Sequence, residues 1–99
     1  MEQVQWRTCE ATPPPKGWRR KAHSFSKLKI YMPGIPKPFT RYSYDWITDK
    51  ARERNQKLGA LRLKRLLETR FQGYKSAILV DLETDTILIT YTQRGYNVH

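Results

Sequence analysis

Residues 26–32, SKLKIYM, alternate between polar and apolar side chains and predict a β-strand. Successive side chains of a strand point to opposite faces, so Leu28 and Ile30 share one face. Lys27 and Lys29 then lie on the other face. Such a strand packs a core on one side and presents positive charge on the other. This alternation predicts a sheet with one buried and one basic face.

The segment that follows predicts a turn and then a helix. Prolines end the strand within residues 33–38, because proline lacks a backbone N–H and restricts the residue before it. A helix is predicted to begin near Asp45 or Thr48, either of which can cap it, and to run to about Arg70. Gly59 lies where the apolar stripe changes face, and glycine costs about 1 kcal/mol inside a helix. We therefore expect a bend or break at Gly59; the alternative is a straight helix buried on two sides.

The C-terminal third predicts a hairpin. Residues 78–82 and 87–91 alternate around the turn residues 83–86, and residues 93–99 are expected to form a short tail. Near the N-terminus, Val4 and Trp6 alternate with polar residues and predict a short strand. The Pro-rich segments 12–17 and 33–38 are expected to be connectors. The predicted core consists of Leu28, Ile30, Leu63, Leu66, Leu67, Phe71, Ile78, Val80, Ile87 and Ile89.

Together these elements predict one small basic α+β domain over residues 1–99, with a mostly antiparallel sheet in the order β-β-α-(α)-β-β packed against a long or bent helix. The lone Cys9 excludes an intramolecular disulfide and a zinc site built on cysteine pairs. No signal-peptide pattern and no apolar run long enough for a membrane span is present. We therefore expect a cytoplasmic protein, without a metal or cofactor and without a membrane partner.

Charge gives the main functional indication. The chain has 19 basic and nine acidic residues, and its net charge is +10. No acidic residue occurs between Ala11 and Tyr44, where basic and aromatic side chains are interleaved. Cations neutralise phosphates and flat rings stack on bases, so this composition favours a nucleic-acid partner. The predicted contact residues are Trp18, Arg19, Arg20, Lys21, Lys27, Lys29, Tyr31, Arg41, Tyr42, Arg52, Arg62 and Arg65.

Two other functions fit the same residues. Exposed tryptophan, tyrosine and arginine are also favoured at protein interfaces, so the domain could be an adaptor or inhibitor that docks on an acidic or nucleic-acid-processing protein. A continuous stripe of cations would favour nucleic acid, and an apolar patch with a charged rim would favour protein. The sequence leaves open whether DNA or RNA, single strand or duplex, is bound, and whether the chain forms a homodimer.

The second alternative is a metal-independent ribonuclease, which needs a base near the ribose 2′-OH and cations for the developing charge. Tyr91, Arg94, Tyr96 and His99 follow one another near the C-terminus, and His23 lies in the basic segment. In size, charge and C-terminal hairpin, residues 75–99 resemble bacterial toxin ribonucleases of the RelE type. The helical hairpin that this resemblance implies after the first strand is replaced here by a Pro-rich segment and another strand.

Overall fold

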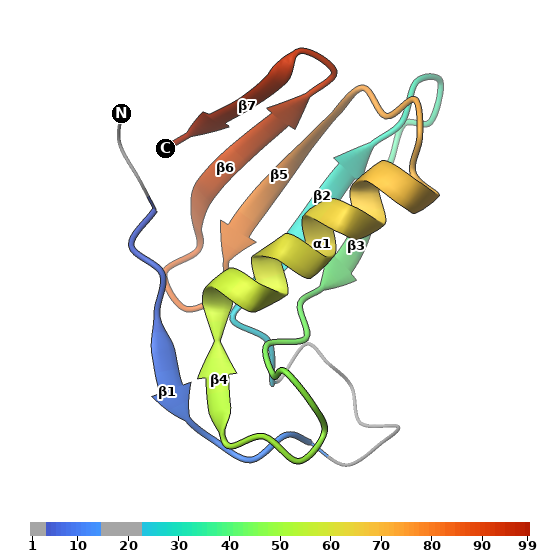
Figure 1. Cartoon of the computed structure of the whole chain (residues 1–99). Helices are drawn as coiled ribbons and strands as arrows, with labels where there is room; N and C mark the ends of the chain where they lie inside the picture. The colour runs from blue at the N-terminus through green and yellow to red at the C-terminus, as the bar shows by residue number, and fades with distance from the viewer. Residues whose placement is uncertain (1–3, 15–22) are drawn as a thin grey trace.

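A five-stranded antiparallel sheet with one helix against one face forms the body of the protein (Figure 1). The computed structural model describes residues 4–14 and 23–99. The strand order is β3-β2-β5-β6-β7, and β1 and β4 form a separate two-stranded sheet. The α+β class and the helix packed on an antiparallel sheet are thus confirmed. The elements are β1 (Thr8–Glu10), β2 (Ser26–Tyr31), β3 (Phe39–Tyr42), β4 (Glu53–Asn55), α1 (Gln56–Arg70), β5 (Ser76–Asp81), β6 (Thr86–Thr92) and β7 (Gly95–Val98).

Strand β2 confirms the predicted alternation. Leu28 and Ile30 are completely buried beneath α1, whereas Lys27 and Lys29 lie on the opposite face. The strand pairs with β3 on one side and β5 on the other. Residues 33–38, the predicted connector, join β2 to β3. The Ile35 N–H donates to the Met32 carbonyl at 3.2 Å and so closes the turn.

Helix α1 begins later than predicted. Residues before Asn55 form a loop and β4, and Asn55 caps the helix by accepting the Leu58 N–H at 3.1 Å. The start near Asp45 or Thr48 is therefore wrong. The helix starts later because tertiary contacts hold the preceding residues in a loop. Asp45 is buried, and its backbone carbonyl accepts the Asn55 N–H at 2.7 Å.

The predicted bend at Gly59 is also wrong, because α1 is one continuous helix from Gln56 to Arg70. A Cβ at Gly59 would lie 1.9 Å from Oδ1 of Asp45 and 2.9 Å from Cβ of Ser43. The glycine therefore lets the helix approach the Ser43–Asp45 loop closely. Glycine has a low helix propensity, but at position 59 its missing side chain allows this close packing.

The faces of the hairpin differ in part from the prediction. Ala77 and Leu79 of β5 face the helix and join the core, while Ile78 lies on the other face and is half-buried. A β-bulge between Leu79 and Val80 shifts the register, so that Ile87 pairs with Val80 and is 43% exposed. A bulge inserts one residue into one strand and so changes the face of those beyond it. The buried core is Leu28, Ile30, Ala60, Leu63, Leu67, Ala77, Leu79, Ile89 and Tyr91, with Leu66 and Phe71 packed against it.

The predictions for the two ends of the described chain are wrong. Val4 and Trp6 lie outside any strand, and the first strand is β1, which pairs with β4. The predicted tail, residues 93–99, contains β7, which forms one edge of the five-stranded sheet. Of the predicted connector 12–17, residues 15–17 lie outside the described residues.

Candidate nucleic-acid interface

The sheet face opposite α1 brings together four of the predicted contact residues. Lys27, Lys29 and Tyr31 point to this face from β2, and the antiparallel register places Tyr42 of β3 directly across from Lys27. Thr40 lies across from Lys29 in the same way. Helix α1 packs against the other face of the sheet (Figure 1). We call the face opposite α1 the open face.

Pairing across the sheet extends the open face to the other edge strand. Lys29 pairs with Ile78, Ile78 with Thr90, and Thr90 with Asn97. None of the paired residues on this face is acidic, whereas β3, β5, β6 and β7 each contribute a serine, threonine or asparagine side chain. The residues on this face are Lys27, Lys29, Tyr31, Thr40, Tyr42, Ser76, Ile78, Ile87, Thr90, Thr92 and Asn97. Val80 also lies on this side of the sheet but is only 5% exposed, so its predicted burial is confirmed.

The two lysines of the open face lie across from apolar residues of β5. Lys27 lies across from Val80 and Lys29 across from Ile78, at the separation at which cross-strand side chains touch. Both lysines are half-buried, which is expected when the stems cover apolar neighbours and the ammonium groups reach water. Neither lysine takes part in an ion pair among the described residues.

The other predicted cations lie elsewhere. Arg41 pairs with Leu28 and so lies on the helix side, with its guanidinium 5.3 Å from the centroid of the Phe71 ring. Arg52 is exposed in the loop before β4, and Arg65 is exposed on α1. The predicted residues Trp18, Arg19, Arg20 and Lys21 lie outside the described residues.

Arg62 has a structural role in this arrangement. Its Nη1 donates to the carbonyl oxygens of Tyr44, at 3.0 Å, and Trp46, and its Nη2 donates to the Ile47 carbonyl at 3.2 Å. These bonds tie the loop after β3 to the helix. Three donors of Arg62 are thus used within the protein, and Arg62 is not part of the open face.

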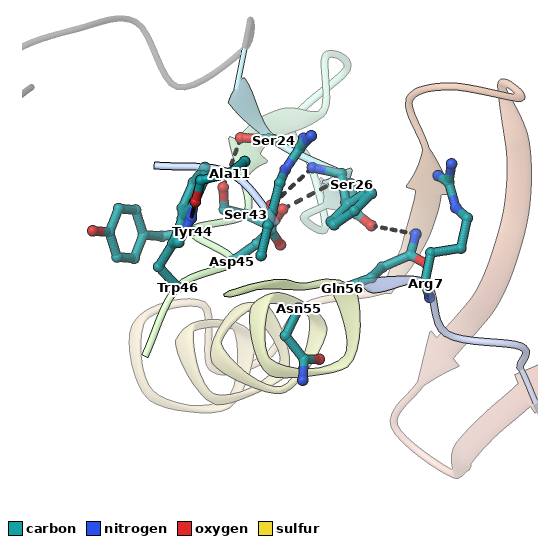
Figure 2. A network of polar contacts seen from close by, with 12 residues as sticks. Arg7, Ala11, Ser24, Ser26, Ser43, Tyr44, Asp45, Trp46, Asn55 and Gln56 are labelled. Atoms are coloured by element: carbon teal, nitrogen blue, oxygen red, sulfur yellow. Dashed lines mark hydrogen bonds and ion pairs between the residues drawn. The ribbon is translucent and has the colours of Figure 1, made fainter. Parts of the chain in front are cut away.

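A buried polar network holds Ser26, the first residue of β2, in place (Figure 2). Lys27, the next residue, is the first of the open face on this strand. Gln56 is the centre of the network: Nε2 donates to Asp81 at 2.9 Å and to Ser26 at 3.2 Å, while Oε1 accepts the Arg7 N–H at 3.1 Å. Nη2 of Arg7 donates to both carboxylate oxygens of Asp81, at 2.7 and 2.6 Å. Burial raises the pKa of Asp81, but the bonds from Gln56, the Thr84 N–H and Arg7 outweigh it and hold the pKa below 3.8.

Asp45 is a second buried carboxylate, and its pKa moves in the opposite direction. It is completely buried, and Oδ2 accepts the Phe25 N–H at 2.8 Å, while Oδ1 has no hydrogen-bond partner among the described residues. Burial raises its pKa above 3.8, against the opposing effects of the Phe25 N–H, the Ser43 hydroxyl, Arg54 and Arg62. The ionised form of Asp45 therefore costs stability at neutral pH.

We expect Asp45→Asn to change the pH dependence of stability. A raised folded-state pKa means that the stability contributed by the protonated carboxyl is present below pH 3.8 and is lost as pH rises through the folded pKa. The asparagine form, which keeps the shape without the charge, should therefore gain free energy of unfolding relative to wild type as pH rises from 4 to 7.5. Chemical denaturation of both proteins at the two pH values measures this. A difference independent of pH, or larger at pH 4, would contradict it.

The residues predicted for a ribonuclease are divided between the two faces of the sheet. Tyr91 is in the core, where burial raises its pKa to about 12, so it is a poor general base at neutral pH. Tyr96 pairs with Tyr91 on the helix side. His99 instead contacts the hydroxyl of Thr90, on the open face, at 2.6 Å. His99 thus lies on the other face of the sheet from Tyr91 and Tyr96.

A groove lies on the helix side of the sheet. It has a volume of about 270 Å³ and lies between α1 and the β6–β7 hairpin. Leu61 and Tyr96 are 55% and 54% exposed there. Its lining includes Trp6, Ala60, Leu61, Tyr96 and Val98 together with Lys57 and Lys64. This is an apolar patch with a basic rim.

Sequence reasoning missed part of the open face. Thr40, Thr90 and Asn97 were not predicted as site residues, and Ile78 was predicted to be in the core. Only the register could have placed them, because alternation gives two equivalent faces until the pairing is known.

Within the described part of the chain, no group of three or more His, Cys, Asp or Glu side chains could hold a metal ion. No described helix is both long and apolar enough to cross a membrane. The sequence matches no known protein family, and neither curated proteins nor solved structures show a significant match.

Proposed function

We propose that the protein binds nucleic acid without catalysis, through the open face of the sheet. The observation that supports this most directly is the placement of Lys27, Lys29, Tyr31 and Tyr42 on one face that carries no acidic side chain in its paired strands. The ammonium groups would neutralise phosphates, and the tyrosine rings would stack on or wedge against bases.

The opposite side of the domain is built to hold this face in place. The carboxylates of Asp45 and Asp81 are buried on the helix side of the sheet, where they organise the loop and the start of β2. Their negative charge is thus kept away from the lysines. Arg54 and Arg62 are similarly engaged with rings and carbonyl groups of the protein. The cations left for a phosphate backbone include Lys27 and Lys29.

The test is the double variant Lys27→Ala with Lys29→Ala, measured by fluorescence anisotropy at several salt concentrations. We expect affinity for labelled nucleic acid to fall roughly tenfold near 0.1 M salt. The slope of log affinity against log salt should become less steep by about 0.7 per lysine on single strands, or about 0.9 on duplex. Both lysines point away from the core, so the domain should stay folded.

The matched control is Lys57→Ala with Lys64→Ala, which removes the same charge from α1, on the opposite side of the domain. It should change affinity less than the open-face variant does. Equal losses from both variants would show attraction by net charge alone and would contradict an interface on the open face. No binding to any nucleic acid would contradict the proposal itself, and the groove beside Leu61 would then favour the protein-docking alternative.

A further inference from the structure

We infer that the nucleic acid bound by the open face is single-stranded, with bases on Tyr31 and Tyr42 and intervening phosphates on Lys27 and Lys29. This inference rests on the proposed function and specifies its ligand. It follows from the shape of the face, from the position of the two rings, and from the neutral polar side chains beside them.

The five-stranded sheet is too wide to enter the major groove of a duplex and contact its bases. Five strands have four spacings of about 4.8 Å, so the face is about 19 Å across. The major groove of B-form DNA is about 12 Å wide and admits a helix or a two-stranded ribbon. Unless it bent the duplex and opened its minor groove, the open face would meet a duplex at its phosphates, where the tyrosine rings find no base.

The two tyrosines need unpaired bases. Among the described residues neither ring stacks on another aromatic side chain, and both are half-buried on the sheet. A base in a duplex is covered above and below by its neighbours, whereas a base of a single strand can place its flat face on a ring. Rings on a sheet surface therefore favour a single strand.

The spacing of the side chains defines a path. Tyr31 is four residues from Lys27 along β2, about 13 Å, and Tyr42 is one strand away from Lys27. The two rings are therefore about 14 Å apart, with Lys29 and Lys27 between them. At that separation they contact two bases that are not neighbours, and the phosphates between those bases lie over the lysines.

The rest of the face suits the neutral parts of a nucleotide. Ser76 of β5 and Asn97 of β7 offer hydroxyl and amide groups, which pair with base edges and sugar oxygens. The Thr90 and Thr92 hydroxyls between them already contact His99 and the turn at Arg94 and Gly95. Charge is thus concentrated on β2, where the backbone would run, and neutral donors and acceptors continue toward β7.

The experiment compares a single strand with the duplex of the same sequence, as RNA and as DNA, with labelled oligonucleotides of about 12 nucleotides. At matched salt, wild-type protein should bind the single strand at least about tenfold more tightly than the duplex, for whichever sugar binds better. Tyr31→Leu with Tyr42→Leu should lose about 30-fold or more on the single strand, with duplex affinity unchanged within about twofold. Tyr31→Phe with Tyr42→Phe keeps both rings and should retain most of the affinity.

Tyr96→Leu removes an exposed ring from the helix side and is the control that should leave single-strand affinity unchanged. Duplex affinity equal to or above single-strand affinity, together with dependence on Lys27 and Lys29, would overturn this inference and leave the proposed function standing. Equal losses of the leucine variant on both ligands would also overturn it. Absence of binding to every oligonucleotide would overturn both.

Discussion

Replacement of Gly59 by alanine is expected to lower the free energy of unfolding by about 2–3 kcal/mol, although alanine is the better helix former by about 1 kcal/mol. The added Cβ would lie 1.9 Å from Oδ1 of Asp45, which is far inside van der Waals contact. Asp45 is held in place by the Phe25 N–H and is completely buried, so it has little room to move. The helix would have to shift from the sheet or break that bond.

Chemical denaturation of the Gly59→Ala protein measures the loss, and a double-mutant cycle with Asp45→Ala identifies its cause. If the carboxylate is the obstacle, the alanine at 59 should cost at least about 1 kcal/mol less when Asp45 is already truncated. Thr69→Ala, at an exposed position of the same helix, is the control and should stay within about 0.5 kcal/mol of wild type. A stabilised Gly59→Ala protein would show that helix propensity outweighs the close approach.

The second large effect is expected for Gln56→Leu, with a loss of about 3–4 kcal/mol in the free energy of unfolding. Leucine has similar volume but makes none of the three side-chain hydrogen bonds of Gln56, to Arg7, Ser26 and Asp81. Each buried polar group left without a partner costs about 1–3 kcal/mol. The buried Asp81 carboxylate would keep only Arg7 and the N–H groups of its own turn.

Gln72→Leu provides the matched control, since Gln72 is exposed just beyond the helix. Urea denaturation of the two variants should differ by at least about 2 kcal/mol. A loss below about 1 kcal/mol for Gln56→Leu would mean that the network contributes little net stability and that its members find other partners.

The sequence predicted elements well where a single face is buried. The alternation in β2 and the apolar spacing of Ala60, Leu63 and Leu67 each report burial on one side, so the local pattern matches the final structure. The pattern failed for β5, in which both faces carry apolar residues, because alternation cannot choose between two apolar faces. The bulge after Leu79, which exposes Ile87, depends on pairing with another strand and has no local pattern.

The start of the helix could not be predicted for a related reason. Residues 45–55 contain helix-compatible side chains, and Asp45 is a good local cap. Its carboxylate instead bonds to Phe25, which is 20 residues away, and β4 pairs with β1. Long-range hydrogen bonds outweigh a modest local preference.

The sequence by itself determined that this is one basic α+β domain and that β2 has an apolar and a cationic side. Composition and alternation are local properties, and both can be read directly from the chain. Tertiary structure alone decided which cations stay available. Arg7, Arg54 and Arg62 hold carboxylates, rings and carbonyl groups within the protein, whereas Lys27 and Lys29 share an open face with Tyr31 and Tyr42. A cation's availability depends on what folding brings within reach of it, and that is set by strand register and helix packing rather than by the order of residues.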